Sequence, residues 1–186
     1  MTLSGQEGQW LTVAQTLLQT AGWDGVAPAV VVSGAAQRLY LLPDCLQSTA
    51  DGCWPVSTAA NGFGNQQDSG CTPTGLHQIA ACIGADAPCG MVFKSRIATG
   101  VIMPDCSEPM GDFITTRILW LQGLQKGVNQ GEGCDSKARY IYIHGTPYST
   151  LLGQPASAGC IRMHNQHILT LFDRVAEGTL VWIDPA

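Results

Sequence analysis

The most informative part of the sequence consists of two runs joined by a loop: RYIYIHGT at residues 139–146 and SAGCIRMHN at residues 157–165. Apolar residues alternate with other residues at Ile141 and Ile143, a pattern that predicts a strand over residues 139–144. His144 is then expected at the end of this strand, where the loop begins.

The second half of the stretch brings a cysteine to a polar turn. Cys160 is expected at a loop-to-helix junction, just before Asn165, a residue that suits a helix N-cap. A thiol in that position can be exposed, and nearby helix-terminal amides favour its thiolate form. Gly159 lets the backbone approach closely, so that neighbouring amides can form an oxyanion hole.

Cysteine and histidine in this arrangement are typical of a nucleophilic pair. A histidine within hydrogen-bond reach of Cys160 would activate the thiol as in other Cys–His enzymes. From spacing alone, a buried cysteine and a hydrogen-bonded histidine remain the alternative. A zinc site at Cys160, His164 and His167 lacks a fourth ligand, and the chain has no C-x-x-C pair. We therefore expect no metal and no cofactor.

The rest of the 186-residue chain predicts a mostly-β sheet or sandwich with a few short helices. A helical extension over residues 1–28, with an amphipathic helix at residues 10–21, precedes one domain over residues 29–186. A second helix is expected at residues 166–176. Strands are expected at residues 29–33, 37–42, 54–58, 75–83, 91–97, 118–121, 139–144 and 179–183.

Two polar, glycine-rich stretches stand out as long loops. They cover residues 61–73 and 123–137. Because long loops on a β scaffold are functional or mobile, these two are candidates for the walls or lid of a cleft.

Charge and hydropathy exclude two classes of partner. The net charge is −5, and the 9 basic residues are scattered, which argues against nucleic acid. The longest apolar run, residues 26–32, is far too short for a membrane span. The sequence shows no export signal at its start, which predicts a cytoplasmic protein, or a periplasmic one if a signal was removed.

The cysteine count supports a reducing compartment. The chain has 8 cysteines. If one is a free nucleophile, the remaining seven cannot all pair, whereas a secreted protein would use them as disulfides.

At residues 139–165 the chain resembles the L,D-transpeptidase catalytic domain, or YkuD family. The family signature is His-Gly, a loop, Ser/Thr-x-Gly-Cys and then Ile/Val-Arg-Met/Leu. The likeness covers roughly residues 29–183 and includes Val56-Ser57-Thr58 with a following Asn-Gly turn, Thr72-Pro73-x-Gly75-x-His77, and Gly178-Thr179-x-Val181. It implies a β-sandwich-like catalytic domain that acts on peptidoglycan stem peptides.

The resemblance assigns roles to the signature residues. Cys160 is the implied nucleophile, His144 its base, and the Gly145 carbonyl the group that orients the imidazole. Arg162 is expected to bind a carboxylate, with a structural pairing to Asp173 or a backbone carbonyl as the alternative. Further substrate-binding or site-supporting residues are Ser157, which would brace the cysteine loop, Gly159, Thr146, and His77, which lines the cleft or packs in the core.

The sequence departs from the family pattern at one position. The residue before Gly159 is usually histidine in the family, and here it is Ala158. The departure puts in doubt the hydrogen bonds that hold the cysteine loop. His164 lies close in sequence and is a candidate to compensate.

Three functions follow from the resemblance. The first is an L,D-carboxypeptidase of murein recycling, which cleaves the bond between meso-diaminopimelate and terminal D-alanine and passes the acyl group to water. The second is an L,D-transpeptidase that forms 3-3 cross-links in the cell wall. The third is an inactive YkuD-fold binding module. The implied partners are peptidoglycan tetrapeptide fragments, with carbapenem-type compounds as inhibitors.

Overall fold

A single ten-stranded sheet dominates the computed structural model, which describes residues 5–47, 52–106 and 111–186. The helices are α1 (Gly5–Thr20), α2 (Asp44–Gln47) and α3 (Asn165–Phe172), with a 3-10 turn at Ser149–Leu151. The strands are β1 (Ala29–Ser33), β2 (Arg38–Leu42), β3 (Cys53–Ser57), β4 (Gly75–Ile83), β5 (Met91–Lys94), β6 (Ile97–Ile102), β7 (Ile114–Gly123), β8 (Tyr142–Thr146), β9 (Ile161–His164) and β10 (Leu180–Asp184). The predicted mostly-β fold with an N-terminal helix is confirmed.

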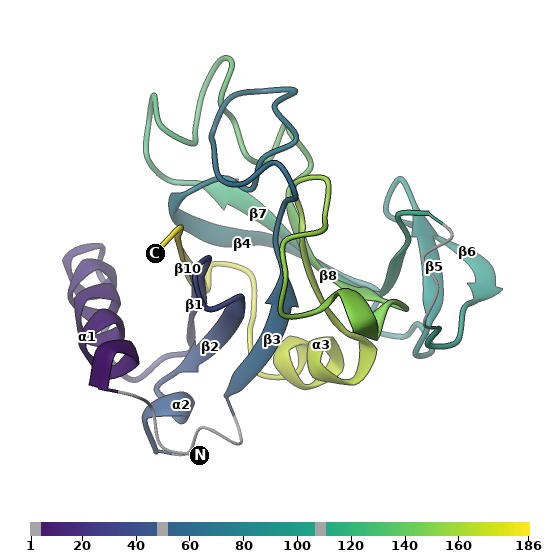
Figure 1. Cartoon of the computed structure of the whole chain (residues 1–186), viewed down its shortest axis with the longest axis horizontal. Helices are drawn as coiled ribbons and strands as arrows, with labels where there is room; N and C mark the ends of the chain where they lie inside the picture. Colours follow the sequence, from purple (N-terminus) through teal and green to yellow (C-terminus); the bar gives the residue numbers. More distant parts are fainter. Residues whose placement is uncertain (1–4, 48–51, 107–110) are drawn as a thin grey trace.

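Eight of the strands close into a ring. Their order is β4-β10-β1-β2-β3-β9-β8-β7, and β7 pairs with β4 to complete the circuit. Strands β5 and β6 extend from β7 as a hairpin, at the right of Figure 1. The β8–β9 pair is parallel, and it lies between β7 and β3 in the ring. This pair carries the site described below.

The core lies inside the ring. Alternate residues of each strand point inward, as the period of two in a strand requires. Val30 of β1, Val56 of β3, Leu121 of β7 and Ile143 of β8 belong to one buried cluster, and Ile168 of α3 joins it. The alternate residues of β8 and β9 therefore point away from this core, to the outer face of the sheet.

Helix α1 covers the outer face of β1 and β2. Leu11 and Leu18 pack on Val31 and Tyr40, and all four side chains are buried. The Trp10 indole donates a hydrogen bond to Asp184 at 3.1 Å, which ties the helix to β10. None of the helices in the described residues has the length and apolar character to cross a membrane.

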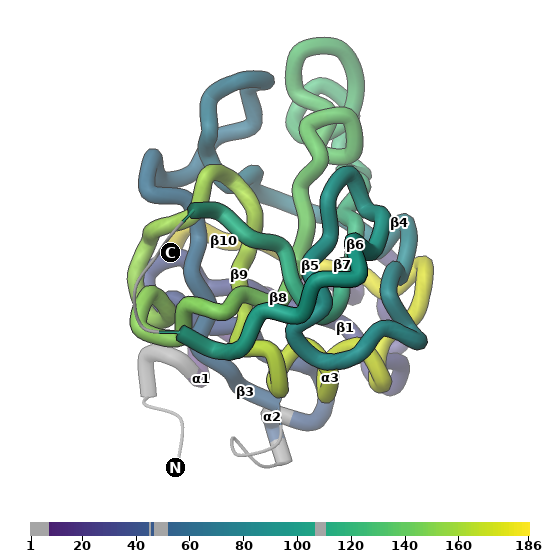
Figure 2. The backbone as a smooth tube through the Cα atoms, turned by 90° about the vertical axis from the view of Figure 1, so that its right-hand side faces the viewer, coloured from purple at the N-terminus to yellow at the C-terminus, as the bar shows by residue number. Residues whose placement is uncertain are grey.

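The two predicted long loops rise from the same end of the molecule, as Figures 1 and 2 show. The backbone N–H of Gln67 donates to the Gly133 carbonyl at 2.8 Å, which joins one loop to the other. Arg139 donates to the carbonyls of Gly64 and Cys71 at 3.1 and 2.6 Å. The loops therefore form one continuous wall.

Several predicted boundaries are wrong. Residues 91–97 are not one strand, because a turn at Ser95 and Arg96 splits them between β5 and β6. Strand β8 starts at Tyr142, because Tyr140 has a φ of 58° and ends a turn instead. Helix α3 ends at Phe172, and its N-cap is His164, whose side chain accepts from the Gln166 N–H.

Candidate active site

The parallel register of β8 and β9 brings His144 and Cys160 to one face. Ile143 pairs with Ile161 and His144 with Arg162, so Cys160 lies one diagonal step from His144. The two side chains thus lie on neighbouring strands, although their hydrogen bonds go to backbone groups and not to each other. Because Ile143 and Ile161 point into the core, His144 and Cys160 share the outer face.

The local structure differs from the sequence prediction at both residues. His144 lies within β8 and not at its end, because the strand continues to Thr146. Cys160 does not precede a helix: it precedes β9, a four-residue strand that the prediction missed. The run Ile161-Arg162-Met163-His164 does alternate, but it is too short to be separated from the adjacent helix by pattern alone.

The His144 imidazole is held in one orientation. Its Nδ1 lies 2.8 Å from the Gly145 carbonyl oxygen, which can only accept, so Nδ1 carries the proton and Nε2 is left as the acceptor. The pKa of His144 is lowered to about 4, chiefly by burial and also by the cation of Arg162, while the Gly145 hydrogen bond and Asp112 oppose the shift. The imidazole is therefore neutral near pH 7 and able to take a proton.

The Cys160 thiol lies against the start of β8. The Tyr142 N–H donates to Sγ at 3.4 Å, and the thiol donates to the Tyr140 carbonyl at 3.5 Å. Burial raises the pKa of Cys160 to about 12, whereas the Tyr142 hydrogen bond, Arg162 and Arg139 act to lower it. The predicted thiolate stabilisation by helix-terminal amides is wrong, because no helix starts at Cys160. The resting pair is a neutral thiol and a neutral imidazole.

Two hydroxyl groups hold the loop before Cys160. Ser157 Oγ donates to the Cys160 carbonyl at 2.5 Å and accepts from the Gly159 N–H at 3.2 Å. Thr72 Oγ1 donates to the Gly159 carbonyl at 2.9 Å. Gly159 has a φ of 133°, which a residue with a side chain adopts only with strain. Because its N–H is bound to Ser157, Gly159 does not offer this amide to an oxyanion.

His164 does not compensate for Ala158. Its Nε2 lies 3.3 Å from the Asp105 carboxylate, and its Nδ1 accepts from the Gln166 N–H at 3.2 Å. The side chain therefore binds the segment before β7 and the start of α3, not the cysteine loop. Thr72 is one of the residues that hold this loop, and its place in the Thr-Pro motif was the available signal.

Arg162 pairs with a residue that the sequence analysis did not name. Its Nη2 lies 2.8 Å from Asp112 Oδ1, and the Arg162 side chain is 7% exposed. The predicted structural alternatives, Asp173 and a backbone carbonyl, are not the partner in this ion pair. The Arg162 Nε is buried and has no hydrogen-bond partner among the described residues.

Two predicted site residues lie away from the pair. His77 is fully buried, with Nδ1 3.0 Å from the Gly75 carbonyl and Nε2 2.9 Å from Ser136 Oγ. It supports the loop that leads into β8 and does not line a cleft. Thr146 is also buried, and its Oγ1 accepts from the Tyr148 N–H at 3.3 Å, which stabilises the turn after β8.

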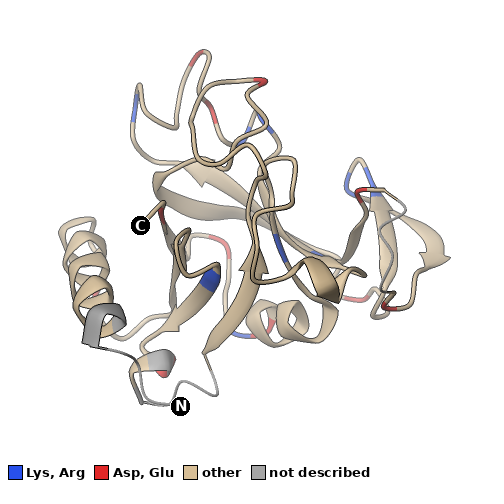
Figure 3. Ribbon diagram, in the orientation of Figure 1, with Lys and Arg blue, Asp and Glu red and all other residues tan. Residues whose placement is uncertain are grey.

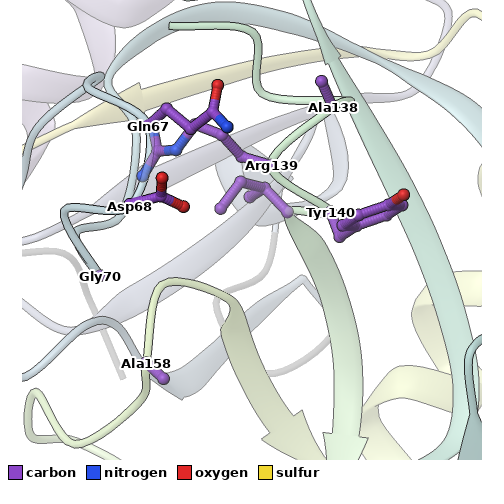
Figure 4. A pocket seen from close by; sticks show the side chains of 8 residues that line it. Gln67, Asp68, Gly70, Ala138, Arg139, Tyr140 and Ala158 are labelled. Carbon is purple, nitrogen blue, oxygen red and sulfur yellow. The ribbon is translucent and has the colours of Figure 1, made fainter. Parts of the chain in front are cut away.

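A cavity of about 430 Å³ opens beside the cysteine loop. Figure 4 shows Ala158 across the cavity from Gln67, with Tyr140 and Arg139 on the wall between them. Ala158 lies two residues before Cys160, and the Tyr140 carbonyl accepts from the Cys160 thiol, so the cavity lies beside the cysteine although Cys160 does not line it. Sequence reasoning predicted that the two long loops form walls but did not name Arg139 or Tyr140.

Comparison with known proteins agrees with this geometry. A sequence model of the YkuD family, the L,D-transpeptidase catalytic domain, matches residues 27–183. A Bacillus licheniformis protein described as L,D-transpeptidase YkuD is 49% identical over 43 residues, or 23% of this chain and 26% of the relative. The chain thus spans about a quarter of that curated relative.

Solved structures share the fold at low identity. L,D-transpeptidase 3 from Mycobacterium tuberculosis with a faropenem-derived adduct has a TM-score of 0.53 and 17% identity, covering 85% of this chain and 60% of its own. Another structure of that enzyme gives a TM-score of 0.51 and 16% identity, covering 85% and 61%. With the family model matched over residues 27–183, the chain belongs to the YkuD family of L,D-transpeptidase catalytic domains.

Proposed function

We propose that this protein is an L,D-carboxypeptidase that removes terminal D-alanine from peptidoglycan tetrapeptides through a thioester on Cys160. The observation that carries the proposal is the oriented imidazole of His144 on the same strand face as the Cys160 thiol. Family membership supports the substrate class.

In the first step Cys160 attacks the carbonyl carbon of the diaminopimelate residue. The thiol proton passes to His144 Nε2 as the sulfur–carbon bond forms, which avoids a free thiolate in a site that opposes one. The carbon–nitrogen bond to D-alanine then breaks, and the imidazolium returns the proton to the leaving amine. The products are free D-alanine and a thioester.

In the second step water attacks the thioester. His144 takes a proton from the water as the carbon–oxygen bond forms, and the sulfur leaves as the carbon–sulfur bond breaks. The proton on His144 then restores the thiol. The product is a tripeptide, and the resting neutral pair is regenerated without a cofactor.

Cationic side chains around the cavity fit an anionic substrate. Arg139 lines the cavity, and its charge acts on Cys160. Arg162 lies beside His144 in the register. A tetrapeptide stem ends in carboxylates, which guanidinium groups bind in bidentate fashion. We propose that these two residues orient the stem, with the cavity as its entry.

We also propose that the enzyme acts in a reducing compartment, on soluble fragments. Cys71, Cys82, Cys89, Cys134 and Cys160 are free thiols in the structure. We expect at least six of the seven other cysteines to titrate as thiols in protein purified without oxidants, because the odd number left beside a nucleophile cannot all pair. Thiol titration under denaturing conditions, with and without reductant, measures this. Two or more stable disulfides would contradict it.

The reaction is tested with purified disaccharide tetrapeptides ending in D-alanine or L-alanine. We expect release of alanine from the first substrate only, detected by liquid chromatography with mass detection. The matching pentapeptide, in which the diaminopimelate–D-alanine bond is not the terminal peptide bond, serves as a further control. If the folded protein releases alanine from neither substrate, the proposed function is contradicted.

A further inference from the structure

Three aromatic side chains form a platform on the outer face of the sheet, next to Cys160. Trp120 of β7 stacks on Tyr140, with ring centroids 5.9 Å apart and an interplanar angle of 28°. Tyr142 meets Trp120 edge-on at 5.9 Å and 80°. Trp120 pairs with Tyr142 in the register of β7 and β8. Neither the strand pattern nor the family signature singles out this aromatic platform.

A guanidinium group occupies the aromatic platform. Arg96 Cζ lies 4.7 Å from the Trp120 ring centroid and 5.0 Å from that of Tyr140, and Arg96 Nη1 donates to the Tyr142 hydroxyl at 3.0 Å. These distances are those of cation–π contacts. A stacked pair of rings with a phenol at its edge is a binding site for a cation, and the chain fills it with its own.

Arg96 reaches the aromatic platform from the tip of the β5–β6 hairpin. Ser95 and Arg96 form the tight turn, with φ of 49° and 69°. Such turns favour Asn-Gly, because larger side chains are strained at positive φ. A position with a strained backbone, where glycine would fit, therefore carries the side chain that contacts both the Trp120 and the Tyr140 rings.

Tyr142 connects Arg96 to the thiol. Its hydroxyl accepts from Arg96, and its N–H donates to Cys160 Sγ. The Tyr140 carbonyl accepts from the same thiol. The cation on the aromatic platform is thus separated from the reacting sulfur by a single residue.

Other cations reinforce this charge. Lys137 Nζ lies 5.6 Å from the Trp120 ring centroid, on the same aromatic platform. Arg139 lines the cavity, and Arg162 is paired with Asp112. Figure 3 shows basic residues at the hairpin tip and beside the loop wall, although the net charge of the chain is −5. Arg96, Lys137 and Arg139 therefore place positive charge near Cys160, whereas Asp112 offsets the charge of Arg162.

We propose that Arg96 is a specificity-determining residue that excludes amine acceptors from the Cys160 thioester and so leaves water as the acceptor. This proposal rests on the proposed function. An amine acceptor reaches the site as an ammonium ion and would need the place that Arg96 holds on Trp120 and Tyr140. Water carries no charge and is not excluded.

The two outcomes differ only in the attacking atom. With an amine, the ammonium ion first loses a proton to solvent; a carbon–nitrogen bond then forms as the carbon–sulfur bond breaks, and a second proton passes to His144 and then to the sulfur. With water, a carbon–oxygen bond forms in the same way. The ratio of aminolysis to hydrolysis products therefore reports the selection at the thioester, independently of how fast the thioester forms.

The test compares wild type with Arg96→Ala, Arg96→Gln and Arg96→Lys, using disaccharide tetrapeptide as donor and excess glycinamide as an amine acceptor that is charged near pH 7. We expect Arg96→Ala and Arg96→Gln to raise the aminolysis-to-hydrolysis ratio about fivefold at low salt. Arg96→Lys should stay near wild type. Gln keeps a donor for the Tyr142 hydroxyl without the charge, so it serves if the alanine variant folds poorly.

Two controls separate charge from loosened packing. Lys94→Ala removes a positive charge from the same hairpin and should leave the ratio unchanged. Hydroxylamine, which is uncharged near neutral pH, should give the same ratio in wild type and Arg96→Gln. Raising the ionic strength should shrink the effect on glycinamide.

The outcomes remain distinguishable from those of the proposed function. If total turnover is normal and the glycinamide ratio is the same in wild type, Arg96→Ala and Arg96→Gln, the proposal about Arg96 is overturned. A lower ratio in the variants would also overturn it, because that result means that Arg96 excludes water instead. Absence of turnover in wild type would overturn the proposed function itself.

Discussion

Cys160→Ala is expected to lower turnover of disaccharide tetrapeptide by about 10⁴-fold or more while the protein stays folded. Removing the sulfur eliminates the thioester route, and alanine fits the space because the side chain only becomes smaller. The thiol makes two weak hydrogen bonds to backbone groups of Tyr142 and Tyr140, so little stability depends on it. Alanine release by mass detection and a circular dichroism spectrum measure the two effects.

Mass spectrometry of the intact protein gives a second readout of the same substitution. A related mycobacterial enzyme was solved with a faropenem-derived adduct. We expect faropenem or a carbapenem to add its mass to wild type and not to Cys160→Ala. Cys89→Ala is the matched control, because Cys89 is exposed and lies outside the site. An adduct on Cys160→Ala, or normal turnover by that variant, would mean that the nucleophile lies elsewhere.

His144→Gln is expected to lower turnover by roughly 10³–10⁴-fold, since the imidazole moves the proton in both steps. Glutamine keeps an N–H that can donate to the Gly145 carbonyl but has no group that takes a proton. The variant thus separates the base from the hydrogen bond that orients it. Turnover within tenfold of wild type would contradict the role of His144 as base.

The pH profile of the wild type tests the same group. The pKa of His144 is lowered to about 4 and that of Cys160 raised to about 12. The imidazole accepts a proton only when neutral, so kcat/KM should be flat from about pH 5.5 to 9 and fall as the pH drops through about 4. A thiolate–imidazolium pair would instead lose activity on the alkaline side as the imidazolium gives up its proton, so a fall in kcat/KM between about pH 7 and 9 would contradict the neutral resting pair.

Acid stability supplies the necessary control for that profile. His77 and His144 both have pKa values lowered to about 4, whereas the unfolded chain binds protons at the ordinary value of 6.5. Because the unfolded state takes up more protons between these values, stability falls as the pH drops through this window. At pH 5 the loss is about 2 kcal/mol for each histidine. Rates therefore need correction for the folded fraction, measured by circular dichroism.

The sequence carried the fold class because the strands obey a period of two and the signature residues keep their order. It predicts His144 and Cys160 as one site, and the structure places both on one face of the β8–β9 pair, but the local structure predicted for them is wrong. Strand β9 is only four residues long and joins α3 directly at His164, so its pattern merges with that of the helix. The predicted stabilisation of the Cys160 thiolate is wrong for the same reason: Cys160 precedes a strand, and a strand start has no helix-terminal amides.

Partners that come from distant segments could not be read from local patterns. Asp112 pairs with Arg162, and Thr72 holds the cysteine loop, across 50 and 87 residues of chain. Arg96 meets Trp120 only because the β5–β6 hairpin lies against β7 and β8. These contacts depend on the pairing order of the whole sheet, which a single sequence with no alignment does not specify.

The proposal that water is the acyl acceptor is tested by analysing the products of a single reaction. Purified disaccharide tetrapeptide at millimolar concentration is incubated with wild type, and the products at early times are separated by liquid chromatography and identified by mass. If water is the acceptor, disaccharide tripeptide and free D-alanine form in equal amounts. Little cross-linked dimer is expected, and little exchange when excess free D-amino acid is added. Dimer as the main early product would contradict it and identify the enzyme as a cross-linking transpeptidase.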